Sequence, residues 1–278
     1  MKALSFFAAA SLTGIGSAQP AKQQNSTIYN PILPGFNPDP SCVFVKEWDN
    51  TFFCATSTFL AFPGLPIHAS KDLQNFRLIG HAFSRPEQLP AFGNITGQQQ
   101  GWYAPTLRYH NKRFWIINSC VGAATGYWST SDPYNNDAWT NVTPTEIPGY
   151  DPDLFWDTDG TVYSAFAKTV QNDPFTTEIH QVNISMPSGN TTTDRFLWNG
   201  TAVQPPEGPH MMLKDGYHYL LLAEGGTAQA HQVTIGRGRS AQGPFEANPA
   251  NPILTAYNTS EYFQTVGHAD LFQDADEN

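Results

Sequence analysis

The chain is poor in cysteine and in basic residues. Only three of its 278 residues are cysteine, and 14 Lys plus Arg stand against 24 Asp plus Glu, which gives a formal net charge of −10. This excess of negative charge argues against nucleic acid or an anionic membrane surface as a partner. Neither a CxxC nor an HExxH spacing occurs, which argues against a zinc site.

The three cysteines, Cys42, Cys54 and Cys120, allow at most one internal disulfide. Cys42 and Cys54 flank a predicted turn and could face each other across a hairpin. The interpretation that the sequence favours is that all three are small, buried, apolar residues.

Helical periodicity and long apolar runs are also missing. No stretch repeats apolar residues at the 3.6-residue spacing of a helix, and none reaches the roughly 20 apolar residues that cross a bilayer. Turn residues and aromatics are abundant instead, with 22 Gly, 22 Pro, 7 Trp, 11 Tyr and 19 Phe. This composition predicts many short strands joined by turns, in an all-β domain with a substantial core.

The N-terminus has the pattern of a targeting segment. Lys2 precedes the apolar run 3–10, and the small residues Gly16-Ser17-Ala18 offer a cleavage site, so residues 1–18 are predicted to be a signal peptide. The polar stretch 19–30 is predicted to be a flexible leader. Glycosylation sequons support a secreted, extracellular glycoprotein. They begin at Asn25, Asn94, Asn141, Asn183, Asn190, Asn199 and Asn258.

A repeated pattern organises the rest of the chain. Five times, at intervals of 47 to 65 residues, a short opening is followed by a β-type run, turn residues and an aromatic or aliphatic strand. The openings are Asp39-Pro40-Ser41, Ala104-Pro105-Thr106, Asp151-Pro152-Asp153, Glu207-Gly208-Pro209 and His268-Ala269-Asp270. Repeats of about 40–60 residues built from strands are typical of propeller blades.

The repeat predicts a five-bladed β-propeller whose last blade is incomplete in this chain. The first four blades are expected at about 30–80, 101–145, 149–203 and 205–250. The fifth begins at Gly267 and ends after one predicted inner strand. Residues 31–278 are therefore expected to form a C-terminally incomplete propeller domain, which is the catalytic domain.

Three carboxylates stand in these openings. Asp39, Asp151 and Glu207 are each predicted to be the first residue of an inner strand, and inner strands begin around one axis. Glycoside hydrolysis needs one protonated and one ionised carboxyl across the bond, and a third carboxylate would raise the pKa of the acid. An Asp-Pro step alone more commonly just initiates a turn. Three carboxylates at equivalent repeat positions favour a catalytic site.

His268 opens the fifth repeat, and two interpretations stay open. It is either a buried, hydrogen-bonded core histidine near the axis, or a group that holds an ion or water or orients a substrate.

Several segments together resemble glycoside hydrolase family 43, most closely its β-xylosidase and α-L-arabinofuranosidase branch. The resemblance runs from about Asn30 to the last residue. Its motifs are Asn37-Pro38-Asp39-Pro40-Ser41, Ala55-Thr56-Ser57-Thr58-Phe59, Phe62-Pro63-Gly64, Asp151-Pro152, Glu207-Gly208-Pro209-His210, Ala223-Glu224-Gly225-Gly226-Thr227 and Gly267-His268-Ala269-Asp270.

The resemblance implies a five-bladed propeller, an inverting mechanism and roles for particular residues. Asp39 matches the general base, Glu207 the general acid, and Asp151 the residue that tunes and orients the acid. Phe59 matches an aromatic wall of the subsite for the terminal sugar, and Tyr103 stands where such xylosidases often carry Trp.

The resemblance also bears on ligands. It implies that no cofactor is required, and that an ion such as calcium can lie on the axis near His268. Two positions depart from the family pattern: Leu60-Ala61 replaces a more polar and aromatic pair, and Asp153 stands where Ser is usual.

The leading hypothesis is a secreted exo-glycosidase that releases β-xylosyl or α-L-arabinofuranosyl residues from plant hemicellulose. Its partner is then a cell-wall oligosaccharide or polysaccharide. An endo-arabinanase is the nearer alternative, and it would need an open groove. A non-catalytic sugar-binding propeller or an inactive fragment is the alternative from another class.

Overall fold

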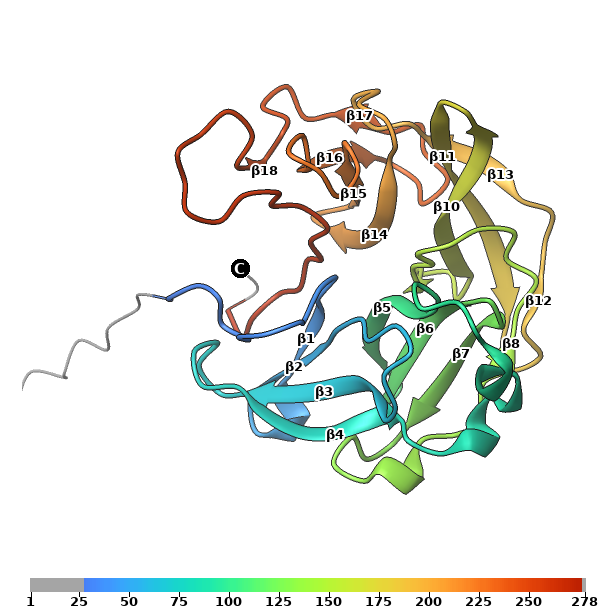
Figure 1. Cartoon of the computed structure of the whole chain (residues 1–278). Helices are drawn as coiled ribbons and strands as arrows, with labels where there is room; N and C mark the ends of the chain where they lie inside the picture. Colours follow the sequence, from blue (N-terminus) through green and yellow to red (C-terminus); the bar gives the residue numbers. More distant parts are fainter. Residues whose placement is uncertain (1–27, 277–278) are drawn as a thin grey trace, which may run out of the picture.

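Four antiparallel sheets make up the fold (Figure 1). The computed structural model describes residues 28–276, so the predicted signal peptide, 1–18, and most of the predicted leader, 19–30, lie outside the described residues. The first two sheets are continuous in sequence. They consist of β1 (Ser41–Val45), β2 (Thr51–Ala55), β3 (Gly64–Ser70) and β4 (Arg77–Phe83), and of β5 (Gly101–His110), β6 (Arg113–Val121), β7 (Ala124–Thr130) and β8 (Thr143–Pro144).

The third and fourth sheets each have five strands. The third consists of β9 (Phe155–Trp156), β10 (Val162–Asn172), β11 (Phe175–Ser185), β12 (Asn190–Thr191) and β13 (Arg195–Trp198). The fourth consists of β14 (Glu207–Lys214), β15 (Tyr217–Glu224), β16 (Gln232–Gly238), β17 (Glu246–Ala247) and β18 (Leu254–Thr255). The predicted first four blades therefore correspond to the four sheets.

The helical content agrees with the sequence. Helices among the described residues are single 3-10 turns, and these are η1 (Lys46–Trp48), η2 (Pro86–Gln88), η3 (Pro90–Asn94) and η4 (Asn136–Ala138). Between residues 28 and 276, no helix has the length and apolar character that a bilayer crossing needs.

Two of the predicted turns are tight hairpins. Asn111-Lys112 joins β5 to β6 and Asp215-Gly216 joins β14 to β15, and all four residues have φ between 50° and 72°. Two central residues with positive φ form the type I′ turn, whose twist matches that of paired strands. The turn chemistry read from the sequence therefore fixes the register of two inner strands.

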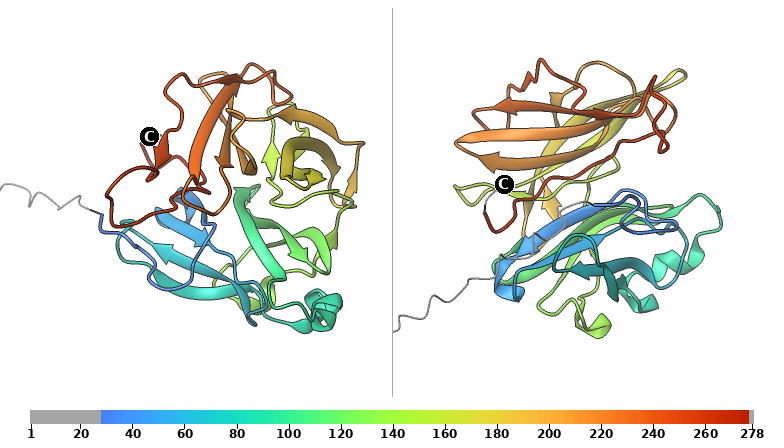
Figure 2. Two further views of the ribbon diagram at one scale, coloured as in Figure 1. Left: turned by 45° about the horizontal axis from the view of Figure 1, so that its top comes forward. Right: turned by 90° about the vertical axis from the view of Figure 1, so that its left-hand side faces the viewer.

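Apolar clusters join each sheet to the next. Trp102 and Trp128 belong to the cluster between the first and second sheets, with their ring centroids 5.2 Å apart. Ile117 and Phe166 belong to the cluster between the second and third sheets, and Leu220 to the one between the third and fourth. The sheets are thus arranged around a common centre as a β-propeller, with four blades in the described residues (Figure 2, left).

The predicted inner strand at 268–272 is wrong for the described structure. Residues 267–274 have no regular secondary structure. The segment is held by side chains: the Ser41 hydroxyl donates to the Asp270 carboxylate at 2.5 Å, and the Phe272 ring lies 5.7 Å from that of Phe52. A strand needs a backbone ladder with a partner, and this segment has none among the described residues. The fifth blade stays a prediction.

The interpretation of three unpaired cysteines is also wrong. Cys42 and Cys54 are direct partners in the β1–β2 register, with Cα atoms 4.1 Å apart, and they form a disulfide. Cys120 is free and buried. Close pairs across an antiparallel ladder lie within the distance that a disulfide spans. The hairpin register, which the sequence interpretation left undecided, decides the pairing.

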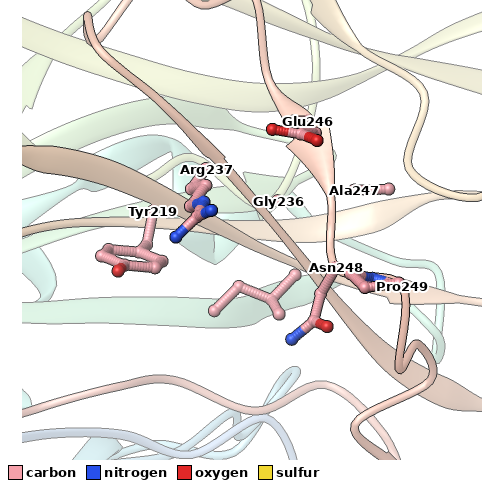
Figure 3. Close-up of a pocket in the computed structure, with 8 residues that line it drawn as sticks. Tyr219, Gly236, Arg237, Glu246, Ala247, Asn248 and Pro249 are labelled. Carbon is pink, nitrogen blue, oxygen red and sulfur yellow. The ribbon is translucent and has the colours of Figure 1, made fainter.

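A hollow of about 350 Å³ lies on the fourth sheet, between β15, β16 and the segment that begins at β17 (Figure 3). Its wall includes Tyr219 and Arg237, and the Arg237 guanidinium also lies 4.8 Å from the centre of the Tyr217 ring. None of the predicted site residues lines this hollow.

Candidate active site

One cavity gathers all six residues that the sequence singled out. Asp39, Asp151, Glu207, Phe59, Tyr103 and His268 line a cavity of about 530 Å³. They come from all four blades and from the segment after β18. Four of them, Asp39, Asp151, Glu207 and His268, stand in the repeated openings up to 229 positions apart, and these openings meet at one cavity as the repeat predicted.

A conformational feature marks all five openings. Asp39, Ala104, Asp151, Gly208 and His268 have φ of 54°, 38°, 51°, 53° and 47°. Side-chain-bearing residues rarely adopt this left-handed region, and Asp is among those that do so most readily. The chain turns sharply at the same point of every repeat.

This feature corrects the predicted register of Glu207. The left-handed residue of the fourth opening is Gly208, so Glu207 stands one position earlier than Asp39 and Asp151 in their repeats. Glu207 is the first residue of β14, and the β14–β15 pairing is irregular between Glu207 and His210. Asp39 and Asp151 lie before the strands that follow them, β1 and β9. The longer Glu side chain reaches the common cavity from this shifted position.

Gly208 is required by both conformation and space. A Cβ on Gly208 would lie 2.6 Å from Nε2 of His268, in addition to the strain of its positive φ. The fourth opening therefore contacts the His268 ring directly. The ring is almost completely buried, and its Nδ1 lies 3.5 Å from a carboxylate oxygen of Asp39. Burial lowers the pKa of His268, against the opposing effect of Asp39. His268 is thus a buried histidine that also lines the cavity, and its role toward an ion or a substrate stays a prediction.

Asp39 is held by a serine that the sequence analysis did not select. The Ser57 hydroxyl donates to Oδ2 of Asp39 at 2.5 Å and accepts from the Ala104 amide at 2.6 Å. Ser57 itself is buried. It connects the first opening to the second and fixes Oδ2 of Asp39, while Oδ1 lies 3.5 Å from Nδ1 of His268. The only sequence signal for this role was the position of Ser57 in the Ala55–Phe59 motif.

The other two carboxyls have raised pKa values. Burial, with the negative charge of Asp39 next, raises the pKa of Glu207 to about 7. Burial also raises the pKa of Asp151 well above its ordinary value, with Glu207 and Asp39 adding to the effect, although the Gly208 amide donates to its Oδ2 at 3.3 Å. Like charges in one poorly solvated cavity cannot all form at neutral pH. The cavity therefore holds a carboxyl with a pKa near neutrality together with the hydrogen-bonded carboxyl of Asp39, an arrangement that general acid–base catalysis can use.

Aromatic side chains wall the cavity. The Phe59 and Tyr103 rings meet edge to face with centroids 4.2 Å apart, and Phe36 lies 5.3 Å from Phe59. Phe36 and Phe175, which also lines the cavity, were missed by the sequence analysis. Both are largely exposed, and neither belongs to a repeat position. Aromatic faces suit the apolar faces of a sugar ring.

Asp153, which stands where Ser is usual in the family pattern, lies outside the cavity. Its side chain is 1% exposed and forms an ion pair with Arg108, with an N–O distance of 2.6 Å. Asp151 thus lines the cavity, while Asp153, two residues later, is bound to a cation outside it.

Comparison with known proteins identifies relatives along almost the whole chain. The sequence model described as glycosyl hydrolases family 43 matches residues 28–278. A xylan 1,3-beta-xylosidase from Vibrio sp. is 37% identical over 260 residues, which are 89% of this chain and 48% of that protein. A non-reducing end alpha-L-arabinofuranosidase from Bacteroides ovatus is 35% identical over 257 residues, 89% of this chain and 45% of that protein.

A solved structure shares the fold. The crystal structure of a xylan beta-1,4-xylosidase from Bacillus halodurans matches with a TM-score of 0.82 and 34% identity, over 90% of this chain and 49% of that one. The chain thus spans about half the length of the curated relatives it matches.

Proposed function

Because the chain belongs to glycosyl hydrolases family 43, we propose that it removes terminal β-xylosyl or α-L-arabinofuranosyl residues from plant hemicellulose. The observation that carries this proposal is the cavity in which Glu207, with its pKa raised to about 7, faces the same space as Asp39. Relatives named as a xylosidase and as an arabinofuranosidase support both sugars as candidates.

The proposed mechanism uses water as the nucleophile. Asp39 accepts a proton from the water as it attacks the anomeric carbon, while Glu207 donates its proton to the leaving oxygen. Asp151 stays close to Glu207. Whether Asp151 is charged or protonated affects the pKa of Glu207 and therefore the protonation state of the acid. The bond to the leaving sugar breaks in the same displacement, so the released sugar has inverted configuration.

The aromatic wall supports release from a chain end. Phe59 packs edge to face against Tyr103, and Phe36 packs against Phe59, so one side of the cavity is bounded by rings. A subsite bounded in this way suits a single terminal sugar, with Phe59 and Tyr103 as its wall and His268 beside Asp39.

We also propose that the protein is secreted and glycosylated and that its ring has five blades. Four of the sequons that the structure describes have exposed asparagines, namely Asn94, Asn141, Asn190 and Asn258. The fifth blade is supported by His268, which repeats the left-handed conformation of the four other openings.

Activity on paired substrates tests the function. The purified protein is assayed on aryl β-xyloside and aryl α-L-arabinofuranoside, and the products from xylo-oligosaccharides and from linear arabinan are separated by chromatography. We expect release of single pentoses from non-reducing ends. Release of internal oligosaccharides from arabinan would identify an endo-arabinanase, and no hydrolysis of any substrate would overturn the proposal.

The stereochemistry of the product tests the mechanism. Proton NMR at early times should show the inverted anomer first, because Asp39 activates water and does not attack carbon. Initial release of the retained anomer would require a covalent intermediate and would contradict the role of Asp39.

A further inference from the structure

A second ring of polar side chains lies along the axis from the cavity. Its members stand two residues after the left-handed residue of each opening. They are Ser41, Thr106, Asp153, His210 and Asp270. Four of these residues are buried, and the side chain of Asp270 is 3% exposed. Every opening therefore contributes one residue to the cavity layer and one to this axial polar layer.

The Arg108 guanidinium lies within the axial polar layer. Arg108 is on β5, two residues after Thr106, and its side chain is 15% exposed. It forms ion pairs of 2.6 Å with Asp153 and with Asp270. Its nitrogens also lie 3.3 Å from the Ser41 hydroxyl and 3.1 Å from Nδ1 of His210. One side chain thus contacts the first, third and fourth openings and the His268 segment.

These contacts define a charged cluster in which the Arg108 guanidinium neutralises the carboxylates of Asp153 and Asp270. Burial alone would lower the pKa of Arg108, but Asp270 and Asp153 raise it above its ordinary value. Burial would raise the pKa of Asp153, but Arg108 holds it below its ordinary range. A guanidinium that binds two carboxylates satisfies charges that would be very costly to bury alone.

A calcium ion does not fit this layer. Calcium takes six to eight oxygen ligands, and the carboxylate oxygens here already accept hydrogen bonds. Asp270 accepts from Arg108 and Ser41, and Asp153 accepts from Arg108 and from the Met211 amide at 2.8 Å. Within the part of the chain that the structure describes, no group of three or more His, Cys, Asp or Glu side chains is placed to hold a metal.

We propose that Arg108 is the built-in axial cation of this propeller, in place of the calcium that the family resemblance implies, and that it is a positioning residue for the cavity. It contacts no residue of the acid–base pair. It holds Asp153, His210 and Asp270, each two residues along the chain from Asp151, Gly208 and His268. Through these short links it sets the separation of the openings that carry the catalytic carboxyls.

Calcium binding tests the first half of the proposal without any assay of activity. Calcium chloride is titrated calorimetrically into the protein after treatment with EDTA, across the range of about 10⁻⁶ to 10⁻³ M in which protein sites bind it. We expect no stoichiometric binding and no change in Tm between calcium and EDTA. Stoichiometric binding that Asp270→Asn abolishes would show that the axis holds calcium, and would overturn the proposal.

Kinetics on the preferred aryl glycoside test the second half, which rests on the proposed function. Arg108→Met is expected to lower kcat by about 10²-fold, the effect of small displacements of catalytic groups, with little change in KM because Arg108 does not touch the sugar. Arg108→Lys keeps the charge and should recover part of kcat. Arg113→Met on β6 serves as the matched control and should retain the wild-type kcat, because the Arg113 guanidinium donates to the Ser129 hydroxyl within its own sheet.

Chemical rescue separates positioning from a general loss of structure. In Arg108→Ala, guanidinium ion at concentrations far below those that denature proteins should restore part of kcat, and ammonium should restore less. A folded Arg108→Met protein with wild-type kcat would contradict positioning. If Arg108→Met does not fold, Arg108→Lys decides. The positioning role would also be contradicted if the folded Arg108→Lys protein had the wild-type kcat and guanidinium did not change the kcat of Arg108→Ala. An inactive wild type refutes the proposed function, while the calcium titration still decides the axial cation.

Discussion

Asp151 and Asp153 are two residues apart, both buried, and have opposite electrostatic properties. The pKa of Asp151 is raised well above its ordinary value by burial and by Glu207 and Asp39, while Arg108 holds the pKa of Asp153 down against its burial. The cavity layer contains carboxyls without a cation, and the axial polar layer contains carboxylates around one. The difference shows that one opening can supply both a cavity carboxyl with a raised pKa and a carboxylate that a buried cation stabilises.

The largest expected effect is the loss of the acid or the base from the cavity layer. Glu207→Ala should lower kcat/KM on natural xylosides by about 10²- to 10⁴-fold, the usual contribution of a general acid. Substrates with very acidic leaving groups should lose much less, because their leaving oxygen departs without a proton. Asp39→Ala should impair both kinds of substrate.

Rates on xylobiose and on a dinitrophenyl xyloside measure this difference. Asp159→Ala removes an exposed carboxylate from a turn of the third blade and is the control. Equal losses on both substrates for Glu207→Ala would remove Glu207 from the role of acid.

The second effect concerns stability, and it should differ in sign between the two aspartates. Asp153→Asn leaves Arg108 with one carboxylate fewer and should reduce the free energy of unfolding by about 3 kcal/mol, as removal of one partner from a buried pair does. Asp151→Asn removes a carboxyl whose ionisation opposes folding and should raise the free energy of unfolding at neutral pH. Urea unfolding of both variants and the wild type measures the difference.

The pH dependence of the two variants sharpens this comparison. The low pKa of Asp153 contributes stability that is complete above the pKa of an unfolded Asp, about 3.9, and is lost as the pH falls through the folded value. The raised pKa of Asp151 has the opposite sign, and its cost grows as the pH rises above that unfolded value. If the stabilities of the two variants changed in parallel as the pH rose from the unfolded value to neutrality, the contrast between the layers would be refuted.

A smaller effect is expected from the hydroxyl that holds the base. Ser57→Ala removes a hydrogen bond of 2.5 Å to Asp39, and bonds to charged groups contribute about 1.5–3 kcal/mol. We expect kcat/KM to fall by about tenfold or more, because the Asp39 carboxyl loses the hydroxyl that fixes its position. Ser70→Ala on β3 is the control, and an unchanged kcat/KM in Ser57→Ala would mean that Ser57 does not act on Asp39.

The smallest expected effect is a shift of the alkaline limb. Activity should fall as the pH rises through about 7, where Glu207 loses its proton. Glu207 and Asp151 interact and titrate as a coupled pair, in which the second proton leaves less readily than the first. Asp151→Asn should therefore move this limb to lower pH. A limb that stays in place would show that Asp151 orients the acid without tuning it.

The sequence predicted the parts of the fold that local chemistry determines. Asn111-Lys112 and Asp215-Gly216 adopt the hairpin turns expected of such residues, and the repeated openings place Asp39 and Asp151 at one cavity. The pairing of Cys42 with Cys54 was not predicted, because it depends on a register that composition does not reveal.

The rest of the site depends on contacts between residues that are not close in sequence. Ser57 holds Asp39 from 18 positions away within the first blade, and Arg108 holds Asp153 from 45 positions away in another blade. Neither residue recurs from repeat to repeat, so periodicity gives no signal for it. The one-residue displacement of Glu207 was hidden because Gly208 takes the left-handed conformation in its place.

The left-handed conformation of the openings has an evolutionary consequence. Such a conformation costs most residues with a side chain about 1–2 kcal/mol; Asn and Asp tolerate it better, and Gly adopts it most easily. Asp39 and Asp151 therefore occupy positions where the backbone by itself favours Gly. If the proposed hydrolysis is lost in a descendant, drift should replace these two aspartates by Gly before it alters Arg108. The loss of the chemistry would then leave the propeller more stable, and its cavity free to acquire a different ligand.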